Sequence, residues 1–366
     1  MSQRIGIAGA GLLGRLLAWE LSRAGHDVDV FDPASGPGPR DASGSLAAGF
    51  TAAGMLSPVA ELERADENVF RLGLRSCALW PGIVQALGEP VPLAMEGSLL
   101  LAHRGDAGAA ERVIGLLKPR ADAAHQPQPV SPEQLRALEP GVNGPALAWL
   151  LPGEGVIHPP LAMQTLAAQA VQRGARFHWQ CRVTRVEPGR LTCAHADGRL
   201  ESADFDHVFD VRGLGARPDL PVRGVRGEIF WLHAPGVVLK RPVRLLHPRH
   251  SVYLVPRPGD VIVVGASEIE SEDRSGVSLR STVELLSAAH SVIPELAEAR
   301  IVHSETNLRP ALPDNLPLLE TASGITRING LFRHGWLLAP ALVEDALQQL
   351  DATAGEVQRQ LERSLS

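Results

Sequence analysis

The feature that most constrains this chain is a glycine-rich turn near its first residues. The sequence GAGLLG at 9–14 stands between an apolar run, RIGIA at 4–8, and a helical pattern over 12–24 that stops at a glycine. A second apolar run, DVDVF, follows at 27–31. A strand, a helix and a second strand in this order predict a parallel β-α-β unit, and therefore an α/β fold.

The spacing of the glycines predicts a site for the phosphates of a dinucleotide. Gly9 permits a tight turn, Gly11 lets a pyrophosphate approach the backbone, and Gly14 lets the helix pack closely on the strand. The backbone of this segment offers the free N–H groups of a helix N-terminus to the phosphates, and it includes Ala10, Leu12 and Leu13. Asp32, at the end of the second strand, is placed to accept hydrogen bonds from a ribose diol, which indicates an adenine dinucleotide with an unphosphorylated ribose. A turn that served packing alone would not account for this carboxylate.

Length and charge exclude several classes of protein. With 366 residues the chain is too long for one compact core of ordinary size, so we expect two domains, or one domain enlarged by insertions. The formal net charge is −6 and no run of Lys or Arg is present, which argues against nucleic acid or anionic lipid as a partner. The sequence shows neither an export signal nor an apolar run long enough to span a membrane, so a cytoplasmic location is expected.

The metal-binding and redox side chains are scattered. Cys77, Cys181 and Cys193 form no CxxC pair, which argues against a disulfide framework and against a thiolate zinc site. His247 and His250 flank a proline in HPRH and have no third ligand at a suitable spacing, so we expect no metal.

The rest of the chain alternates between helical and strand patterns. Residues 60–88 and a segment starting at Ser131 read as helical, and Glu133 and Gln134 behind this serine favour a capped helix N-terminus. Residues 222–265 hold β-rich runs separated by Pro and Gly, which predict an antiparallel sheet. From Pro340, placed at a first helical position, an amphipathic pattern predicts a further helix.

Residues 43–58, SGSLAAGFTAAGMLSP, form a loop of small residues suited to lie along a buried cofactor. At this point the chain resembles the amine-oxidising flavoproteins of the D-amino-acid oxidase family, and within that family the glycine oxidases of thiamine biosynthesis. The segments that carry the resemblance run through the chain in the family's order: TAAGML (51–56), GVIHP (155–159), RVTRVE (182–187), YLVPR (253–257), GAS (265–267), LRPALPDNLP (308–317) and NGLFRHGWLLAPA (329–341).

The resemblance implies a Rossmann-like FAD-binding domain of the glutathione-reductase type and an antiparallel-sheet α+β domain for the substrate. Residues 1–80, 145–218 and 304–366 are assigned to the first domain, and residues 81–144 and 219–303 to the second. FAD is expected to bind noncovalently, and the amides at the start of the last helix are suited to stabilise negative charge on the flavin. In addition to GAGLLG and Asp32, the implied cofactor contacts are Ser45, Ala53, Gly54, Met55, Val183, Gly213, Gly330, Arg333, His334, Gly335, Trp336, Leu337 and Leu338.

Arg309 lies in a proline-rich segment, NLRPALPDNLP at 307–317. Its prolines fix φ and remove backbone donors, so we expect a stiff loop rather than a helix or a central strand. From the segment alone, this arginine is equally an exposed residue paired with Glu305 or Asp314. The resemblance instead implies that the Arg309 guanidinium binds the substrate carboxylate in a bidentate fork.

Two further residues belong to the expected catalytic group. By the resemblance, the Tyr253 hydroxyl helps to hold the same carboxylate, and Arg333 lies between flavin and substrate. Cross-strand packing is the alternative role for the tyrosine, and an ordinary ion pair near the last helix is the alternative for Arg333.

Together these expectations describe an enzyme that removes hydride from the Cα of glycine, or of a similar small amino acid, with FAD and gives the imine. The electrons go to oxygen or another acceptor, and a thiazole synthase of thiamine biosynthesis is an expected consumer of the imine; a homo-oligomer is compatible with the sequence. The alternatives are a D-amino-acid or imino-acid dehydrogenase of the same family, a nicotinamide dehydrogenase, and a dinucleotide-binding protein without catalysis. A flavin-dependent aromatic hydroxylase is disfavoured because its late GDAAH-type motif is missing.

Overall fold

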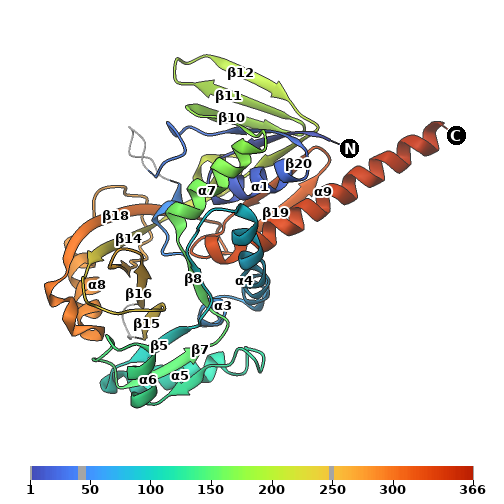
Figure 1. The fold of residues 1–366 in the computed structure, drawn as a ribbon. Helices are drawn as coiled ribbons and strands as arrows, with labels where there is room; N and C mark the ends of the chain where they lie inside the picture. The colour runs from blue at the N-terminus through green and yellow to red at the C-terminus, as the bar shows by residue number, and fades with distance from the viewer. Residues whose placement is uncertain (1, 40–46, 247–250, 366) are drawn as a thin grey trace.

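Four sheets organise the computed structural model, which describes residues 2–39, 47–246 and 251–365 (Figure 1). The glycine-rich turn belongs to a six-stranded sheet whose pairs are parallel except for β19 and β20. In spatial order its strands are β19 (Leu318–Ala322), β20 (Ile325–Asn329), β13 (His207–Asp210), β1 (Arg4–Ala8), β2 (Asp27–Phe31) and β9 (Arg176–His178). The predicted β-α-β unit is confirmed, because β1 and β2 are adjacent and parallel.

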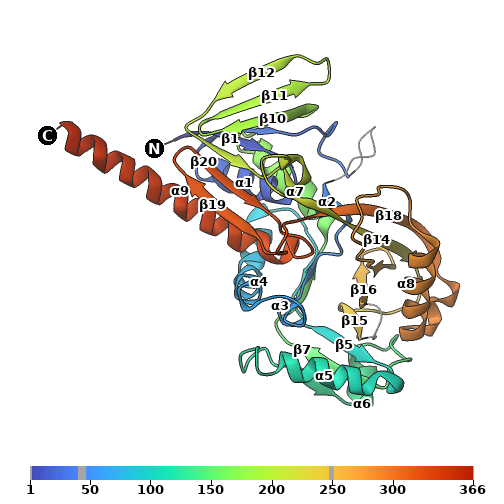
Figure 2. The same cartoon turned by 180° about the vertical axis from the view of Figure 1, so that it is seen from behind.

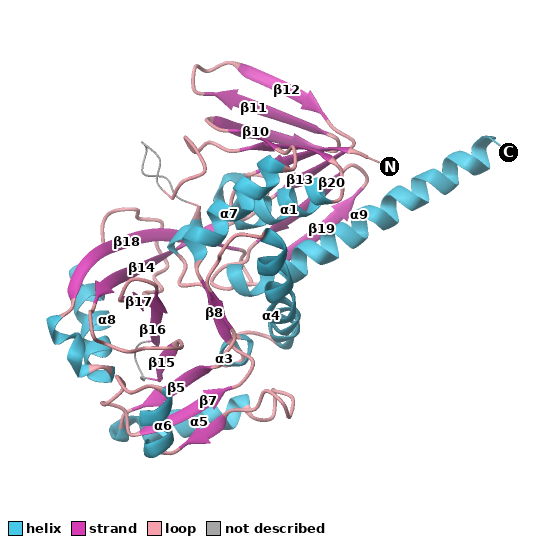
Figure 3. Ribbon diagram, in the orientation of Figure 1, coloured by secondary structure: helices cyan, strands magenta, loops and turns pink. Residues whose placement is uncertain are grey.

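Helices cover one face of this sheet and a small sheet covers the other (Figure 3). The helices are α1 (Leu12–Arg23), α7 (Pro159–Gln172), α4 (Glu67–Leu87) and α9 (Gly335–Leu365), and their apolar side chains share one core with β1 and β2. On the opposite face lie β10 (Cys181–Glu187), β11 (Arg190–His195) and β12 (Leu200–Asp204), which form an antiparallel sheet. Burial on both faces explains the nearly continuous apolar run of β1, RIGIA.

The second large sheet has eight strands and forms the other side of the molecule. Its strands, in spatial order, are β18 (Arg300–Ala311), β14 (Arg223–His233), β17 (Val261–Gly265), β16 (Ser251–Arg257), β15 (Val243–Leu246), β5 (Ser98–Ala102), β7 (Leu147–Leu151) and β6 (Gln128–Val130). The four described strands within residues 222–265, β14 to β17, pair antiparallel as predicted. The sheet extends further, since β5 pairs with β15 in parallel and β18 pairs with β14. Around it lie α5 (Ala107–Leu117), α6 (Pro132–Leu138), α8 (Leu279–Val292) and the short 3₁₀ helices η1 (Arg104–Asp106) and η3 (Pro294–Glu298).

Short elements connect the two large sheets. They are α2 (Ala48–Thr51), β3 (Met55–Leu56), α3 (Pro58–Glu61), β4 (Leu93–Ala94), β8 (Gly155–Ile157) and η2 (Gly213–Ala216). The helical prediction for residues 60–88 resolves into the end of α3 and the whole of α4. The predicted cap is confirmed, because the Ser131 hydroxyl accepts from Gln134 N while Gln134 Oε1 accepts from Ser131 N. The division of the chain into two discontinuous domains stays a prediction.

The expected start of the last helix at Pro340 is wrong, because α9 begins at Gly335 and contains this proline. A proline inside a helix leaves the carbonyl four residues earlier without its usual donor. Here that carbonyl belongs to Trp336, and it accepts a hydrogen bond of 3.0 Å from Nε1 of Trp80 on α4. Contact with α4 therefore replaces the missing backbone bond, and α9 continues as a long projecting helix in Figure 1 and Figure 2.

The prediction that Arg309 lies on a loop is also wrong. Arg309 is part of β18, where it pairs with Val225 of β14, and the next residue, Pro310, pairs with Gly224. A strand can accommodate this proline because β18 is at the edge of its sheet, where a ladder donor can be missing. A strand fixes the direction of the arginine side chain more firmly than a loop would.

Candidate functional site

A cavity of about 1250 Å³ runs from the glycine-rich turn to the eight-stranded sheet. Its walls come from the ends of β1, β2 and β13, from residues 47–57, from β14, β16 and β18, and from the segment 328–337 before and within α9. Its volume exceeds the range usual for pockets that bind one drug-sized ligand. It has room for an extended cofactor and a small substrate together.

The glycine-rich turn has the geometry of a phosphate cradle. Gly9 adopts φ +107°, and a Cβ on Gly14 would lie 1.9 Å from the Gly9 carbonyl oxygen, so neither position accepts a side chain. At Gly11 a Cβ would meet nothing nearer than 4.0 Å, and this glycine faces the cavity as the N-cap of α1 without a capping side chain. The first amides of α1 are therefore available to an anion.

Asp32 is held at the rim of this cradle. Its carboxylate accepts hydrogen bonds from Ala10 N at 2.7 Å and from Ala34 N at 2.9 Å, one to each oxygen. A carboxylate oxygen has more than one acceptor direction, so both oxygens can still bind a diol. The position beside the turn fits the ribose contact predicted for Asp32.

Most of the predicted cofactor contacts line the cavity. They are Gly9, Ala10, Gly11, Leu12, Leu13, Asp32, Ala53, Gly54, Met55, Val183, Gly213, Gly330, Arg333, His334, Gly335, Trp336 and Leu337. Gly14 and Leu338 do not line it; Gly14 instead allows the close packing of α1 against the turn. Ser45 lies outside the described residues. The contact of each residue with FAD stays a prediction.

Arg309 and Tyr253 meet at the end of the cavity that is walled by the eight-stranded sheet. Two glycines make room for them, since a Cβ on Gly227 would lie 2.5 Å from Arg309 Cζ and a Cβ on Gly265 would lie 2.6 Å from the Tyr253 hydroxyl. The Arg309 Nη1 group donates only to backbone carbonyls, those of Ser267 at 3.0 Å and Arg226 at 3.4 Å. Neither of the carboxylates considered from the sequence is its partner.

Among the described residues no carboxylate lies within ion-pair distance of Arg309. Burial lowers the pKa of its guanidinium, against the opposing attraction of Tyr253 and Glu268. Burial also raises the pKa of the Tyr253 phenol, although Arg309 and other arginines oppose the shift, so the hydroxyl stays protonated at neutral pH. This end of the cavity therefore presents a cation and a hydroxyl donor without an anion bound to either, which suits a carboxylate ligand.

Arg333, the third expected catalytic residue, is in a different electrostatic state. Glu61 accepts from its Nε at 2.9 Å and from its Nη2 at 2.6 Å, and Glu268 accepts from its Nη1 at 3.2 Å. The ion pair raised as an alternative from the sequence is therefore present, but Arg333 also lines the cavity, and its place between flavin and substrate stays a prediction. Burial lowers the pKa of this guanidinium, but the two carboxylates outweigh it and raise the pKa overall.

Glu61, at the end of α3, is the centre of this cluster. Besides Arg333 it binds Arg244 Nη2 at 3.2 Å and His334 Nε2 at 2.9 Å. Burial would raise the pKa of the Glu61 carboxyl, but Arg333, Arg244 and His334 hold it well below the usual value. The sequence did not reveal Glu61 as a site residue, and its one local signal is a carboxylate in the apolar run that follows TAAGML.

Other site residues that the sequence left unassigned are Arg244, Glu268, Gly227 and Gly265. Arg244 stands out only as a charge inside the apolar strand VRLL, and Glu268 only as the residue after GAS. Their partners are far away in sequence, so a local pattern cannot identify them.

The described part of the chain has neither a metal-binding cluster nor a membrane-spanning helix. In residues 2–39, 47–246 and 251–365, no group of three or more His, Cys, Asp or Glu side chains is arranged to hold a metal ion. No helix in the same ranges is long and apolar enough to cross a membrane.

A dinucleotide cradle joined to a cavity with a buried arginine at its other end is the arrangement expected of an FAD-dependent oxidoreductase that binds a substrate carboxylate. The model of the DAO family of FAD-dependent oxidoreductases matches residues 4–346, and the chain belongs to this family. It is 34% identical over 358 residues to a protein of Rhizobium etli assigned as the thiamine biosynthesis oxidoreductase ThiO, covering 97% of this chain and 99% of that protein.

Two solved structures have the same fold over almost the whole chain. Glycine oxidase from Geobacillus kaustophilus has a TM-score of 0.79 and 25% identity over 93% of both chains. Iminodiacetate oxidase from Chelativorans sp. BNC1 has a TM-score of 0.79 and 26% identity over 94% of both chains. The predicted family, fold class, FAD cofactor and oxidoreductase class are confirmed.

Proposed function

We propose that the protein oxidises glycine, or a similarly small amino acid, to its imine with FAD. The observation that carries this proposal is the state of Arg309, a cavity arginine with backbone carbonyls as its hydrogen-bond acceptors and no carboxylate in ion-pair distance among the described residues. A substrate carboxylate supplies the missing partner through a bidentate pair, and Tyr253 donates a further hydrogen bond to it.

The residues of the cavity also suit the cofactor. The glycine-rich turn and the open N-terminus of α1 bind the pyrophosphate, Asp32 binds the adenosine ribose, and the segment 330–338 lies along the flavin. The first turn of α9 carries no acidic side chain, so its amides and the helix dipole favour negative charge there. When bound, FAD supplies the acceptor for the hydride that leaves the substrate Cα.

The protein groups contribute orientation rather than proton transfer. Arg309 and Tyr253 fix the carboxylate, and the Cα attached to it then has a single direction in which to present its hydrogen. The Arg333 and Glu61 pair forms a rigid wall beside this position, because the side chains of Arg333, Arg244 and His334 all bind the Glu61 carboxylate. The neutral form of the substrate amine is the reactive one, because its lone pair assists the departure of hydride.

The route of the product follows from the similarity to the Rhizobium etli protein. We propose that the imine of glycine is consumed in thiazole formation for thiamine, with a thiazole synthase as the partner. The number of carboxylates in the substrate is a separate question, since the two solved relatives are named for glycine, which has one, and for iminodiacetate, which has two.

The experiment is to mix the oxidised holoenzyme anaerobically with glycine, sarcosine, D-alanine, D-proline and L-proline, and to follow bleaching of the flavin. Glycine or sarcosine is expected to give the largest kcat/KM. A bulky D-amino acid that exceeds glycine by about tenfold, which corresponds to roughly 1.4 kcal/mol, would replace the proposal with a D-amino-acid dehydrogenase. A peroxide assay in air then shows whether oxygen takes the electrons.

A further inference from the structure

Arg333 forms ion pairs with two carboxylates, those of Glu61 and Glu268. Glu268 lies on the cavity wall, and its side chain is 40% exposed. We propose that Glu268 is a specificity-determining residue that restricts the substrate to amines with one carboxylate. Its negative charge keeps Arg333 from serving as a second carboxylate site. This inference rests on the proposed function, because it takes the substrate carboxylate to be bound at Arg309.

The first step is the contrast between the two arginines. Arg309 offers its guanidinium to a ligand, whereas Arg333 donates through Nε and Nη2 to Glu61 and through Nη1 to Glu268. Glu61 also accepts hydrogen bonds from Arg244 and His334, so it cannot turn away from Arg333 without losing both of these bonds. Glu268 is therefore the partner that a second substrate carboxylate would have to replace.

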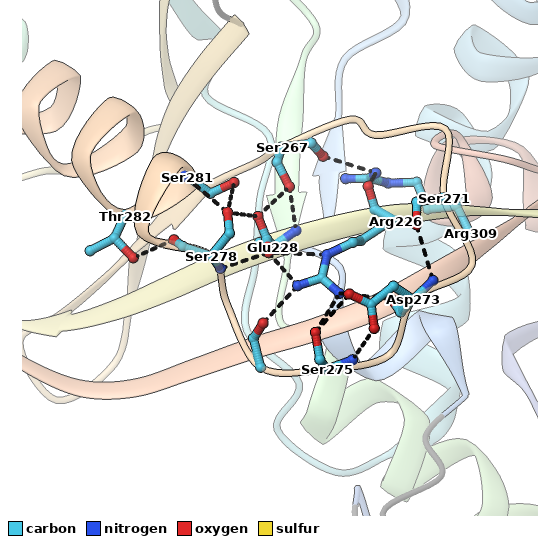
Figure 4. Close-up of polar contacts among 11 residues, drawn as sticks. Arg226, Glu228, Ser267, Ser271, Asp273, Ser275, Ser278, Ser281, Thr282 and Arg309 are labelled. Carbon is cyan, nitrogen blue, oxygen red and sulfur yellow. Dashed lines mark hydrogen bonds and ion pairs between the residues drawn. The ribbon is translucent and has the colours of Figure 1, made fainter.

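The second step is the way in which the protein holds the backbone next to Glu268, through the contacts of Ser267 that Figure 4 shows. The preceding residue, Ser267, accepts a hydrogen bond from Arg309 Nη1 through its carbonyl, and its hydroxyl donates to Glu228 at 3.1 Å and accepts from Glu228 N at 2.9 Å. Glu228 is buried and accepts from both Nε and Nη2 of Arg226. The backbone that carries Glu268 is thus fixed to the same strand, β14, that supports Arg309.

The third step is electrostatic. A ligand with a second carboxylate near Arg333 would approach both Glu61 and Glu268, and like charges in a partly desolvated cavity repel each other. A neutral group of the same size meets no such repulsion. Since Glu268 is partly exposed, solvent screens its effect, and we expect discrimination of about tenfold rather than complete exclusion.

The experiment compares two ligands that differ by one charge. Iminodiacetate carries two carboxylates, and its monoamide has nearly the same shape with one carboxylate. We expect the holoenzyme to reduce its flavin with the monoamide about tenfold more efficiently, in kcat/KM, than with iminodiacetate. In Glu268→Gln this ratio is expected to fall to less than about threefold, because the repelling charge is gone.

Two further variants serve as controls. Glu268→Asp keeps the charge and is expected to keep the ratio within about twofold of the parent value. Glu272→Gln removes the same charge from the same loop, where Glu272 is 45% exposed, is paired with Arg217 and does not itself line the cavity, and it should leave the ratio unchanged. Flavin absorbance and far-ultraviolet circular dichroism confirm that each variant is folded.

The outcomes separate this inference from the proposed function. Equal kcat/KM for the two ligands in the parent enzyme, or a ratio that Glu268→Gln does not change, would overturn the role of Glu268 even if glycine is a good substrate. If no amine with a carboxylate reduces the flavin, the proposed function itself fails, and the role of Glu268 fails with it.

Discussion

At the scale of single residues, the two arginines Arg309 and Arg333 of the cavity differ in their binding partners. Arg309 has backbone partners and is open to a ligand, while Arg333 is held by Glu61 and Glu268. Gly227 and Gly265 belong to the same arrangement, because any larger residue at either position would push the Arg309 or Tyr253 side chain out of place.

The substitution Arg309→Ala tests whether Arg309 binds the substrate carboxylate. Arg309→Ala is expected to keep its flavin and to lose about two decades of kcat/KM for glycine, since a charge-assisted pair with a carboxylate contributes on the order of 3 kcal/mol. Steady-state kinetics measure the loss. Arg300→Ala, at the exposed start of the same strand, is the matched control. An Arg309→Ala enzyme with unchanged kcat/KM would exclude this residue from substrate binding.

The substitution Glu61→Gln tests how much the ion pairs of Glu61 with Arg333 and Arg244 stabilise the fold. Glu61→Gln leaves Arg333 and Arg244 without a buried anion, and the free energy of unfolding at pH 7 is expected to fall by about 3 kcal/mol. Because the folded pKa of Glu61 lies below its unfolded value, the stabilisation is complete above the unfolded pKa and is lost as pH falls through the folded one.

The difference between the parent and Glu61→Gln should therefore shrink below about pH 4. Urea unfolding at pH 7 and pH 3.5 measures it. Glu298→Gln, whose parent side chain is 90% exposed, serves as the control. A gap of the same size at both pH values would contradict the low pKa assigned to Glu61.

At the scale of elements, the pairing of α4 with α9 supports the segment 330–337, which lines the cavity. The two helices are in contact, and the rings of Trp80 and Trp336 stack with 5.4 Å between their centroids. The indole of Trp80 also bonds the carbonyl that Pro340 leaves without a donor. A break in the helix ladder is thus repaired by a neighbouring helix.

A double-mutant cycle measures how much the hydrogen bond from Trp80 to the Trp336 carbonyl contributes to stability. Trp80→Phe is expected to destabilise the fold by about 1–3 kcal/mol, because a buried carbonyl loses its partner. In a Pro340→Ala background the new backbone N–H at position 340 can bond the same carbonyl, so the cost of Trp80→Phe should be about 1 kcal/mol smaller. Urea unfolding of the four proteins measures the coupling, and additive effects would show that the indole bond has no such role.

The same elements show what a sequence can and cannot predict. The glycine-rich turn, Asp32 and the Ser131 cap are local patterns, in which the residues that interact are within about one β-α-β unit, and all of them are present as predicted. The position of Arg309 in β18 and the true start of α9 were missed, because each proline is tolerated through a tertiary context: a sheet edge in one case and Trp80 in the other. Glu61 was missed since its partners lie 183 to 273 residues away.

At the scale of the whole molecule, FAD is expected to connect the two large sheets, because the cavity touches both. Apoprotein should therefore gain stability with FAD, by about 2.7 kcal/mol when free FAD is 100-fold above its Kd. FMN lacks the adenosine half that the glycine-rich turn and Asp32 are predicted to bind, so its effect should be much smaller. Thermal unfolding at matched concentrations measures both.

Asp32→Ala provides the internal control for this comparison. It should reduce the rise in Tm produced by FAD and leave the effect of FMN unchanged, because only FAD has the adenosine ribose. If Asp32→Ala reduces the rise in Tm equally for FAD and FMN, the substitution acts on folding and not on the ribose contact.

The order of strands in the six-stranded sheet has a consequence for the synthesis of the protein. β1 carries the chain into the glycine-rich turn, but its second neighbour, β13, begins only at His207, and β20 follows at Ile325. At about 5–20 residues per second, a ribosome needs roughly 10–40 seconds to make the intervening chain. During that time one edge of β1 has no partner, and the wall at 328–337 does not yet exist. The nascent chain must therefore remain unaggregated with an incomplete nucleotide cradle, and stable capture of the flavin has to wait until the segment 328–337 has been made.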